Sequence, residues 1–287
     1  MAMHLTSAER VVYAEAGITK GAIADYYRAV SRWLLPELAR RPLSLVRCPS
    51  GASAQCFFQK HHAASLGEHV QSIRLRELDG EDDYLYVEDI EGVLELVQMN
   101  TLEFHVWGSH VDSVETPDRL VFDLDPAEGI TWKDLKAAAR QLRDRLAELG
   151  LRSWVRLSGG KGVHVVVPIR PGPDWAQVKA FCEEFADSMV ALAPDRYIAT
   201  ASRSAREGLI FIDWLRNSRG ATSVSNWSLR ARPGAPVAMP LTWEELGRVT
   251  RTAAFDMRRA LRRARTLKRD PWHAMYRSRQ QLPSRAS

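Results

Sequence analysis

Residues 119–126 read RLVFDLDP and place two carboxylates in an otherwise apolar run. Side chains alternate between the two faces of a strand, so Phe122 and Leu124 are expected on one face and Asp123 and Asp125 on the other. Adjacent carboxylates repel each other, and a divalent cation is the usual counter-charge for oxygen ligands. A strand end with two solvated aspartates fits equally well, so the pair alone leaves both interpretations open.

Length and charge set broad limits on the class of protein. The chain has 287 residues, enough for one large domain or two smaller ones, and a net charge of +5 from 40 basic and 35 acidic residues. An excess of this size permits nucleic-acid binding without identifying it. No run of about eighteen apolar residues is present, and residues 1–10 lack a signal-peptide pattern, so we expect a cytoplasmic protein without a membrane partner.

The cysteines give little support for a covalent framework. Cys48, Cys56 and Cys182 are odd in number and lack a C-x-x-C spacing. We therefore expect buried thiols rather than disulfides. A zinc site of Cys48 and Cys56 with His61 and His62 is the less favoured alternative.

A glycine-rich segment, SGGKG at residues 158–162, separates two strand-like runs. Its glycines let backbone N–H groups approach an anion, while Ser158 and Lys161 add a hydroxyl and a positive charge. The spacing is not that of a P-loop, and a strand follows instead of a helix. We interpret the segment as a phosphate-binding turn, with a plain hairpin turn as the alternative. His164 alternates with valines and leaves the apolar face.

A later strand-like run also has an aspartate near its end. Asp213 closes an apolar run at residues 209–214, as Asp123 and Asp125 close theirs. Arginines suited to bidentate contact with a triphosphate come next, namely Arg216, Arg219, Arg230 and Arg232. Amphipathic helices predicted over residues 131–150 and 174–192 would cover one face of an α/β or α+β sheet.

The first part of the chain offers candidate nucleic-acid contacts. A helix over residues 18–38, capped by Thr19, would put Lys20 in its first turn, where a lysine opposes the helix dipole unless an anion lies nearby. Phe57 and Phe58 are adjacent in a strand predicted over residues 54–59, so one must be exposed, beside Lys60, as a possible base-stacking platform.

Two further segments stay ambiguous from the residues alone. In a strand predicted over residues 102–107, His105 lies on the less apolar face, where a functional and a structural role are equally compatible. Residues 248–269 are predicted to be helical and carry nine basic residues against one acidic residue, Asp256. They form either a nucleic-acid face or a solvated helix, and the solvated helix is the default.

Three motifs in this order are similar to those of the archaeo-eukaryotic primase superfamily: FDLDP at 122–126, SGGKGVH at 158–164 and FIDWLRN at 211–217. Four more stretches extend the resemblance over nearly the whole chain to the polymerase domain of bacterial ATP-dependent DNA ligase D. They are GITKG at 17–21, FFQKH at 57–61, LEFHVWG at 102–108 and SLRARPGAPV at 228–237. The chain departs from the family pattern at Ser7-Ala8 and within residues 62–69, both in the region of the expected DNA-end contacts.

The resemblance implies an α+β fold, with a primase-type, RRM-like palm whose mixed or antiparallel catalytic sheet is flanked by helices, plus a smaller N-terminal α/β part. It implies a single primase-polymerase domain over residues 1–287. Residues 1–100 would carry the DNA-end contacts, 101–240 the catalytic core, and 241–287 a basic helical segment.

The resemblance also assigns roles by position within the motifs. The catalytic, metal-binding carboxylates would be Asp123, Asp125 and Asp213. The nucleotide pocket would be formed by His105, Ser158, Lys161, His164, Arg216, Arg230 and Arg232. The DNA contacts would be Arg10, Lys20, Phe57, Phe58 and Lys60.

The implied activity is nucleotidyl transfer to the 3′ end at a gap or break in DNA, preferably of ribonucleotides, with two Mn²⁺ or Mg²⁺ ions, during non-homologous end joining. The implied partners are gapped or broken duplex DNA with a 5′-phosphate, nucleoside triphosphates, Ku, and a ligase domain or ligase protein, on the bacterial nucleoid. Two alternatives use the same residues: a metal-dependent nuclease or phosphodiesterase, and a non-catalytic module that binds DNA ends.

Overall fold

The computed structural model describes residues 5–61, 66–77, 80–202 and 204–284. The chain divides into two units, each built from three separate segments. The first unit comprises Met1–Asp112, Val224–Met239 and Phe255–Lys268, and the second comprises Ser113–Ser223, Pro240–Ala254 and Arg269–Ser287. The assignment of a single domain to residues 1–287 stays a prediction. Among the described residues, no helix has the length and apolar character needed to cross a membrane.

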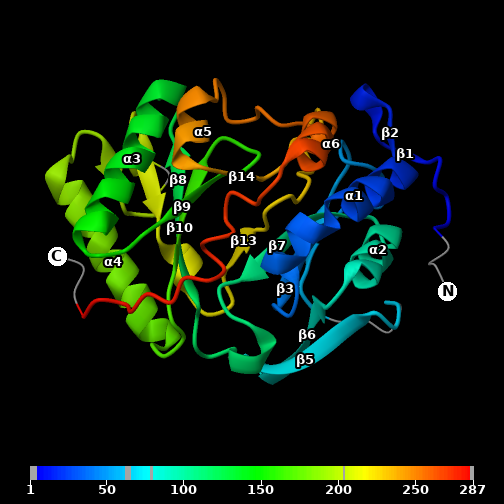
Figure 1. The fold of residues 1–287 in the computed structure, drawn as a ribbon, viewed down its shortest axis with the longest axis horizontal. Coiled ribbons are helices and arrows are strands. Elements are labelled where there is room, and N and C mark those ends of the chain that lie inside the picture. The colour runs from blue at the N-terminus through cyan, green and yellow to red at the C-terminus, as the bar shows by residue number, and fades with distance from the viewer. Residues whose placement is uncertain (1–4, 62–65, 78–79, 203, 285–287) are drawn as a thin grey trace. The chain divides into compact units, whose positions relative to one another are not determined.

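A six-stranded sheet in the order β11-β12-β8-β10-β9-β14 forms the centre of the second unit (Figure 1). Its strands are β8 (Arg119–Pro126), β9 (Trp154–Leu157), β10 (Val163–Pro168), β11 (Tyr197–Ile198), β12 (Ile210–Asp213) and β14 (Met239–Leu241). Strand β8 runs antiparallel to β10 on one side and to β12 on the other, whereas β11 and β12 are parallel. The expected mixed, largely antiparallel sheet is therefore confirmed.

Helices α3 (Trp132–Glu148) and α4 (Trp175–Leu192) pack against this sheet (Figure 1). Each begins after a capping residue, because the side chain of Thr131 accepts from Asp134 N (3.2 Å) and that of Asp174 accepts from Gln177 N (2.8 Å). The ring of Phe122 meets that of Phe185 on α4, with centroids 4.9 Å apart. The even-numbered side chains of β8 thus lie on the helix-covered face.

The other face of β8 is divided between apolar packing and charge. Val121, Trp154 and Val166 pack there with Trp272 and Met275 from the C-terminal segment. The indole of Trp272 is fully buried and donates to Val155 O (3.1 Å). Beyond Val121 on the same face come Asp123 and Asp125, so the apolar cover gives way to carboxylates towards the end of the strand. The unit is completed by the short helix α5 (Trp243–Arg248).

The first unit contains a sheet in the order β13-β7-β3-β4, a hairpin and three helices. The sheet strands are β3 (Leu43–Arg47), β4 (Phe57–Gln59), β7 (Thr101–Trp107) and β13 (Thr222–Val224); the hairpin is β5 (Val70–Glu77) with β6 (Gly80–Val87), and β1 (Val11–Tyr13) pairs with β2 (Ile18–Thr19). The helices are α1 (Lys20–Leu38), α2 (Ile90–Gln98) and α6 (Met257–Thr266). The short 3-10 helices of the chain are η1 (Ala14–Ala16) and η2 (Val111–Ser113), and in the second unit η3 (Ser204–Arg206) and η4 (Leu215–Asn217).

Two buried tyrosines fix α1 within the first unit. Tyr27 donates to Leu102 O (2.8 Å) on β7 and accepts from Leu229 N (3.0 Å). Tyr26 donates to Trp227 O (2.7 Å). Both phenols are fully buried, and each hydroxyl donates to a backbone carbonyl, which satisfies its proton away from water.

The expectation of free thiols at Cys48 and Cys56 is wrong, because these residues form a disulfide. Strands β3 and β4 pair antiparallel with Arg47 opposite Phe57, so the next residues outward, Cys48 and Cys56, face each other with Cα atoms 4.4 Å apart. That separation suits a disulfide. The spacing of the cysteines along the sequence does not reveal the strand register that creates this Cα separation. Cys182 is a buried free thiol, as expected, and His62 lies outside the described residues.

Two predicted elements are shorter in the structure. The strand expected over residues 54–59 begins only at Phe57. The helix expected over residues 248–269 is also wrong in its extent, since α5 ends at Arg248 and α6 begins at Met257. The intervening chain is extended where Val237 N donates to Phe255 O (2.9 Å), and Asp256 then caps α6 by accepting from Arg259 N (2.8 Å).

Candidate active site

The strand register aligns four charged or titratable side chains in one row across the second unit's sheet. Asp123 on β8 lies opposite Asp213 on β12 and opposite His164 on β10. His164 in turn lies opposite Arg156 on β9. Residues directly opposite one another share a face, and Asp125 lies two residues further along the same face of β8. The three aspartates predicted from the sequence are therefore neighbours.

Both ring nitrogens of His164 are engaged within this row. Arg156 Nε donates to His164 Nδ1 (3.1 Å), which leaves the proton on Nε2, 3.2 Å from Asp123 Oδ1. Burial lowers the pKa of His164 to about 4, against the opposing effect of Asp123, so the ring is neutral at pH 7. His164 thus orients Asp123. Sequence reasoning missed Arg156, and the available signal was an arginine inside the apolar run 154–157.

The three carboxylates differ in pKa because their electrostatic surroundings differ. Burial favours the protonated form of Asp123, but His164 and Arg216 outweigh it and hold the pKa of Asp123 at about 2. Burial and then the charge of Asp123 raise the pKa of Asp125 to about 6, and burial also raises the pKa of Asp213. The cluster therefore holds more negative charge than its surroundings readily stabilise.

Arg216 on η4 contacts this cluster directly. Its Nε lies 3.1 Å from Asp213 Oδ2 and 3.6 Å from Asp123 Oδ2. The side chain is 40% exposed, so it is free to turn towards solvent. The buried Asn217 anchors η4, because its amide oxygen accepts from Val121 N (2.7 Å) and its amide nitrogen donates to Val121 O (2.8 Å).

The residues at this site fit a divalent cation. The donor set consists of carboxylate oxygens, the ligands that Mg²⁺ and Mn²⁺ prefer. In the part of the chain that the structure describes, the buried Asp123 Oδ1 has no well-aligned hydrogen-bond donor. A Cβ on Gly162 would lie 3.1 Å from Oδ1 of Asp123 and of Asp125, and 2.7 Å from Leu124 O. The glycine turn therefore passes close beside both carboxylates, where a larger residue would intrude.

A cavity of about 840 Å³ opens beside Asp125. Its positive side chains are Lys161, from the glycine-rich turn, and Arg206, from η3. The Arg206 guanidinium lies 3.6 Å from the ring centroid of Phe211 and donates to Ala201 O (2.7 Å). Ser158 does not line the cavity; its hydroxyl donates to Gly162 O (2.9 Å) and closes the turn. Sequence reasoning missed Arg206, which carries no local signal beyond its position before β12.

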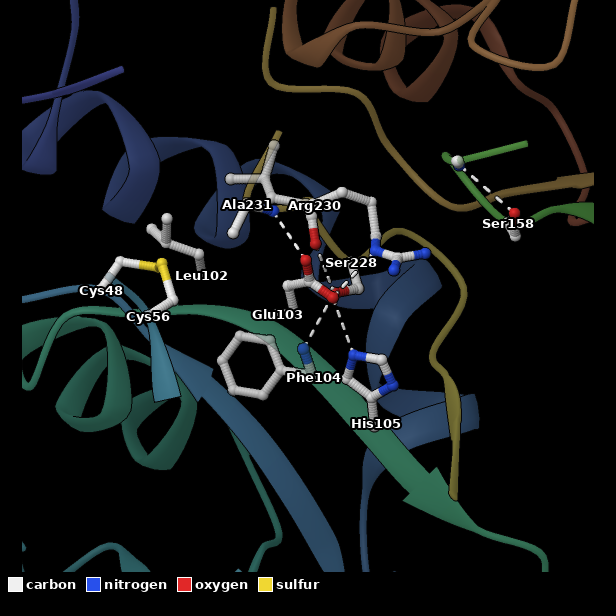
Figure 2. Close-up of polar contacts among 12 residues, drawn as sticks. Cys48, Cys56, Leu102, Glu103, Phe104, His105, Ser158, Ser228, Arg230 and Ala231 are labelled. Atoms are coloured by element: carbon white, nitrogen blue, oxygen red, sulfur yellow. Dashed lines mark hydrogen bonds and ion pairs between the residues drawn. A yellow bond between two sulfur atoms is a disulfide. The ribbon is translucent and has the colours of Figure 1, made fainter. Parts of the chain in front are cut away.

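A buried polar cluster in the first unit brings together two other predicted residues (Figure 2). Glu103 on β7 accepts from His105 Nε2 (2.8 Å) and Arg230 Nε (2.8 Å) through Oε2, and from Ala231 N (2.7 Å) through Oε1. Burial favours the protonated form of Glu103, but His105 and Arg230 outweigh it and lower its pKa to about 2. Arg232 is exposed and is not part of the cluster. Glu103 was missed, although it shares the face of His105 in the alternating strand.

Lys20 and Arg10 form a second basic site in the first unit. Lys20 is only 4% exposed, and its Nζ donates to Thr6 O (3.1 Å) and Gln98 Oε1 (3.0 Å). Arg10 donates to Pro49 O and to the side-chain oxygen of Asn100. All four acceptors are neutral. Burial and then the charge of Arg10 lower the pKa of Lys20. Two adjacent cations held by neutral acceptors are suited to an anion.

Phe57 and Phe58 are both exposed on β4, at 45% and 72%, so the prediction of at least one exposed ring is confirmed. The Phe58 ring meets the His105 ring edge-on, with centroids 5.9 Å apart. Lys60, by contrast, is engaged, because its Nζ donates to Glu77 Oε1 (2.6 Å) and to Tyr84 Oη (3.1 Å).

His61, Glu77 and Asp82 offer three possible metal ligand atoms within 4.8 Å of one another. The ammonium group of Lys60 already lies at Glu77, which makes this cluster a poorer cation site than the three aspartates.

Known proteins similar to this chain define both its class and its family. The fold is that of a primase-type polymerase, since the family model described as "LigD, primase-polymerase domain" matches residues 19–272. The chain belongs to the LigD primase-polymerase domain family, which is a family of nucleotidyltransferases.

Relatives of this chain are themselves named LigD proteins. The chain is 35% identical over 271 residues to the multifunctional non-homologous end joining protein LigD of Pseudomonas aeruginosa, covering 94% of this chain and 32% of that protein. It is 28% identical over 256 residues to the bifunctional LigD of Bacillus subtilis, covering 89% of this chain and 41% of that protein. The chain thus spans about a third of the length of the first of these relatives.

A solved structure also matches, the polymerase domain of Mycobacterium tuberculosis ligase D in complex with DNA. The TM-score is 0.88 at 30% sequence identity, covering 96% of this chain and 99% of that chain. The similarity therefore includes both units of the chain.

Proposed function

We propose that this chain adds nucleotides, preferably ribonucleotides, to DNA 3′ ends at gaps and breaks, as the polymerase component of non-homologous end joining. The observation that carries the proposal is the row of Asp213, Asp123 and His164 with Asp125 beside it, next to a cavity whose cations are Lys161 and Arg206. Carboxylates for metal ions and cations for a polyphosphate are the two parts that nucleotidyl transfer needs.

Asp123, Asp125 and Asp213 would hold two divalent ions, Mn²⁺ or Mg²⁺. When bound, these ions would supply the positive charge that activates the 3′-hydroxyl and stabilises the departing pyrophosphate. His164 keeps Asp123 oriented, and Arg156 sets the tautomer of His164. The partly exposed Arg216 would turn from the carboxylates to the nucleotide when the ions neutralise its present partners.

The incoming nucleotide would be held through its phosphates. Lys161 and Arg206 line the cavity beside Asp125, and the Ser158 hydroxyl keeps the glycine turn closed so that its N–H groups stay ordered. His105, Arg230 and Arg232 are further proposed contacts to the nucleotide. Glu103 would hold the first two in place, since it binds both side chains with one oxygen.

The DNA end would be held by the first unit. Arg10 and Lys20 present two cations with neutral partners, which suits a 5′-phosphate, and Phe57 and Phe58 expose two rings for stacking on template bases. Lys60 would contribute after exchange from Glu77. Ku and a ligase domain or protein on the cytoplasmic nucleoid are the proposed partners, by similarity to relatives named for end joining.

The test is extension of a gapped duplex with labelled ribo- and deoxynucleoside triphosphates. Asp123→Asn and Asp213→Asn should each lower extension at least about a thousandfold while leaving binding to a 5′-phosphorylated gap within about twofold. Lys20→Gln should weaken binding only when the 5′-phosphate is present. Shortening of the labelled strand would indicate a nuclease instead, and tight binding without extension by the wild type would indicate a non-catalytic end-binding module.

A further inference from the structure

Helix α6 differs in charge from the other long surface helices of the chain. Its sequence, MRRALRRART, contains five arginines and no acidic residue. Helix α3 also carries several basic residues, but it includes Asp134, Asp144 and Glu148. Two of the arginines of α3 pair with these acidic residues, since Arg143 lies 2.7 Å from Asp144 and Arg145 lies 2.7 Å from Glu148. Helix α3 has the mixed charge of a solvated helix, and α6 does not.

Three of the five arginines form one stripe on α6. Arg258, Arg262 and Arg265 are exposed and lie at spacings of four and three residues, which places them on the same side of the helix. Met257, Ala260 and Ala264 are buried on another side. Among the described residues, the three arginines of this stripe have no ion-pair partner, whereas Arg259 lies 3.8 Å from Asp256.

A stripe of this kind is unfavourable in the isolated protein. Like charges four and three residues apart on a helix repel each other. Arg258 also lies in the first turn, where a positive charge opposes the helix dipole. A row of phosphates along the stripe would reverse the sign of both effects, which is the physical reason for looking for a polyanion here.

The packing of α6 on α1 fixes where that polyanion would lie. Ala264 O on α6 accepts from Arg32 (3.0 Å) and Trp33 (3.3 Å) on α1. Lys20 begins α1, and Arg32 follows twelve residues later, about 18 Å along the helix axis. For a duplex that runs along the axis of α1, with a rise of about 3.4 Å per base pair, this distance corresponds to about five base pairs from a 5′-phosphate at Lys20.

We propose that Arg258, Arg262 and Arg265 bind backbone phosphates of the duplex downstream of the gap, about five base pairs from its 5′-phosphate. The proposal rests on the proposed function in one respect, that Lys20 and Arg10 hold the 5′-phosphate. The stripe is about 10 Å long, enough for about three phosphates of one strand. It contacts no base, so it adds affinity without sequence preference.

The experiment compares R258Q/R262Q/R265Q with K133Q/R143Q/R145Q, a variant of α3 that removes the same three charges elsewhere. Binding of each full-length variant to two 5′-phosphorylated gapped duplexes is measured by fluorescence anisotropy across a NaCl series. The duplexes share one upstream arm and have downstream arms of about four and about sixteen base pairs, one too short to reach the stripe and one long enough.

On the long arm, the α6 variant should lose about 2.7 from the slope of log K against log salt, about 0.9 for each phosphate released, and bind at least about tenfold more weakly at low salt. On the short arm it should match the wild type, and the α3 variant should match the wild type on both arms. Equal losses on both arms, or equal losses in both variants, would overturn the proposal by showing a general effect of net charge.

Folding and catalysis are checked separately. Replacing the arginines relieves repulsion within α6, so the unfolding temperature of the α6 variant should not fall; R262Q alone should still lower the slope by about 0.9 on the long arm. Extension of the short-arm substrate should be unchanged in the α6 variant. If the wild type fails to extend any substrate, the proposed function fails, whereas the dependence of binding on arm length still decides the role of the stripe.

Discussion

Replacing Glu103 by glutamine removes a negative charge that binds both His105 and Arg230. Glu103 is titrated in the folded state at a pKa of about 2, against 4.5 for an ordinary glutamate. This lowering of the pKa corresponds to roughly 3 kcal/mol of folding free energy at neutral pH. The Glu103 side chain is only 7% exposed, so solvent screens little of this interaction. We expect Glu103→Gln to destabilise the protein by about 3 kcal/mol at pH 7.

The sign of the pH dependence follows from the lowered pKa. A carboxyl group with a depressed folded-state pKa contributes its full stability above the unfolded value of 4.5 and loses it as the pH falls towards about 2. The difference in unfolding free energy between wild type and Glu103→Gln should therefore be constant from pH 7 to pH 5. It should shrink to less than half of that value at pH 3.

Urea unfolding monitored by circular dichroism at these pH values measures the difference. The control is Glu115→Gln, which breaks the pair with Arg219 (2.7 Å) at a side chain that is 64% exposed, and should cost about 1 kcal/mol or less. A Glu103→Gln variant within about 0.5 kcal/mol of wild type at pH 7 would refute the reasoning. A difference that stays the same from pH 7 to pH 3 would refute the role of the charge.

Three further predictions concern other parts of the chain. Gly162→Ala should weaken Mn²⁺ binding, measured by calorimetry, and lower the unfolding free energy by about 1–3 kcal/mol, because the added Cβ would lie 2.7 Å from Leu124 O. The control Gly172→Ala, which has open space around it, should change neither the Mn²⁺ affinity nor the stability. Cys56→Ser should lower the unfolding free energy by roughly 2.5 kcal/mol through loss of the loop constraint, and dithiothreitol should produce the same loss in wild type but none in the variant. Phe58→Ala should weaken binding to a gapped duplex by about 1–3 kcal/mol. The thermal unfolding temperature should not change, since the ring is 72% exposed. Unchanged affinity for the duplex would exclude stacking of this ring on a base.

Local patterns predict the elements of this protein well because their causes are local. Alternation in RLVFDLDP correctly separates Phe122 from Asp123, and Thr19, Thr131 and Asp174 cap the helices that follow them. The order of the three motifs also predicted the LigD primase-polymerase family, and the match to the family model confirms this prediction. The predicted helix over residues 248–269 failed because pairing of the chain near Val237 with Phe255 keeps the segment before α6 extended.

The amino-acid pattern alone sets which face of a strand each side chain occupies, since a period of two needs no knowledge of the neighbouring strand. It therefore placed Asp123 and Asp125 together. The neighbours of these side chains depend on the folded structure, because it joins residues far apart in the chain. It places Asp213 and His164 beside Asp123, and Arg230 beside Glu103. Register also brought Cys48 and Cys56 into bonding distance, against the prediction from their spacing. Strand pairing is set by packing of the whole unit, which no local pattern encodes.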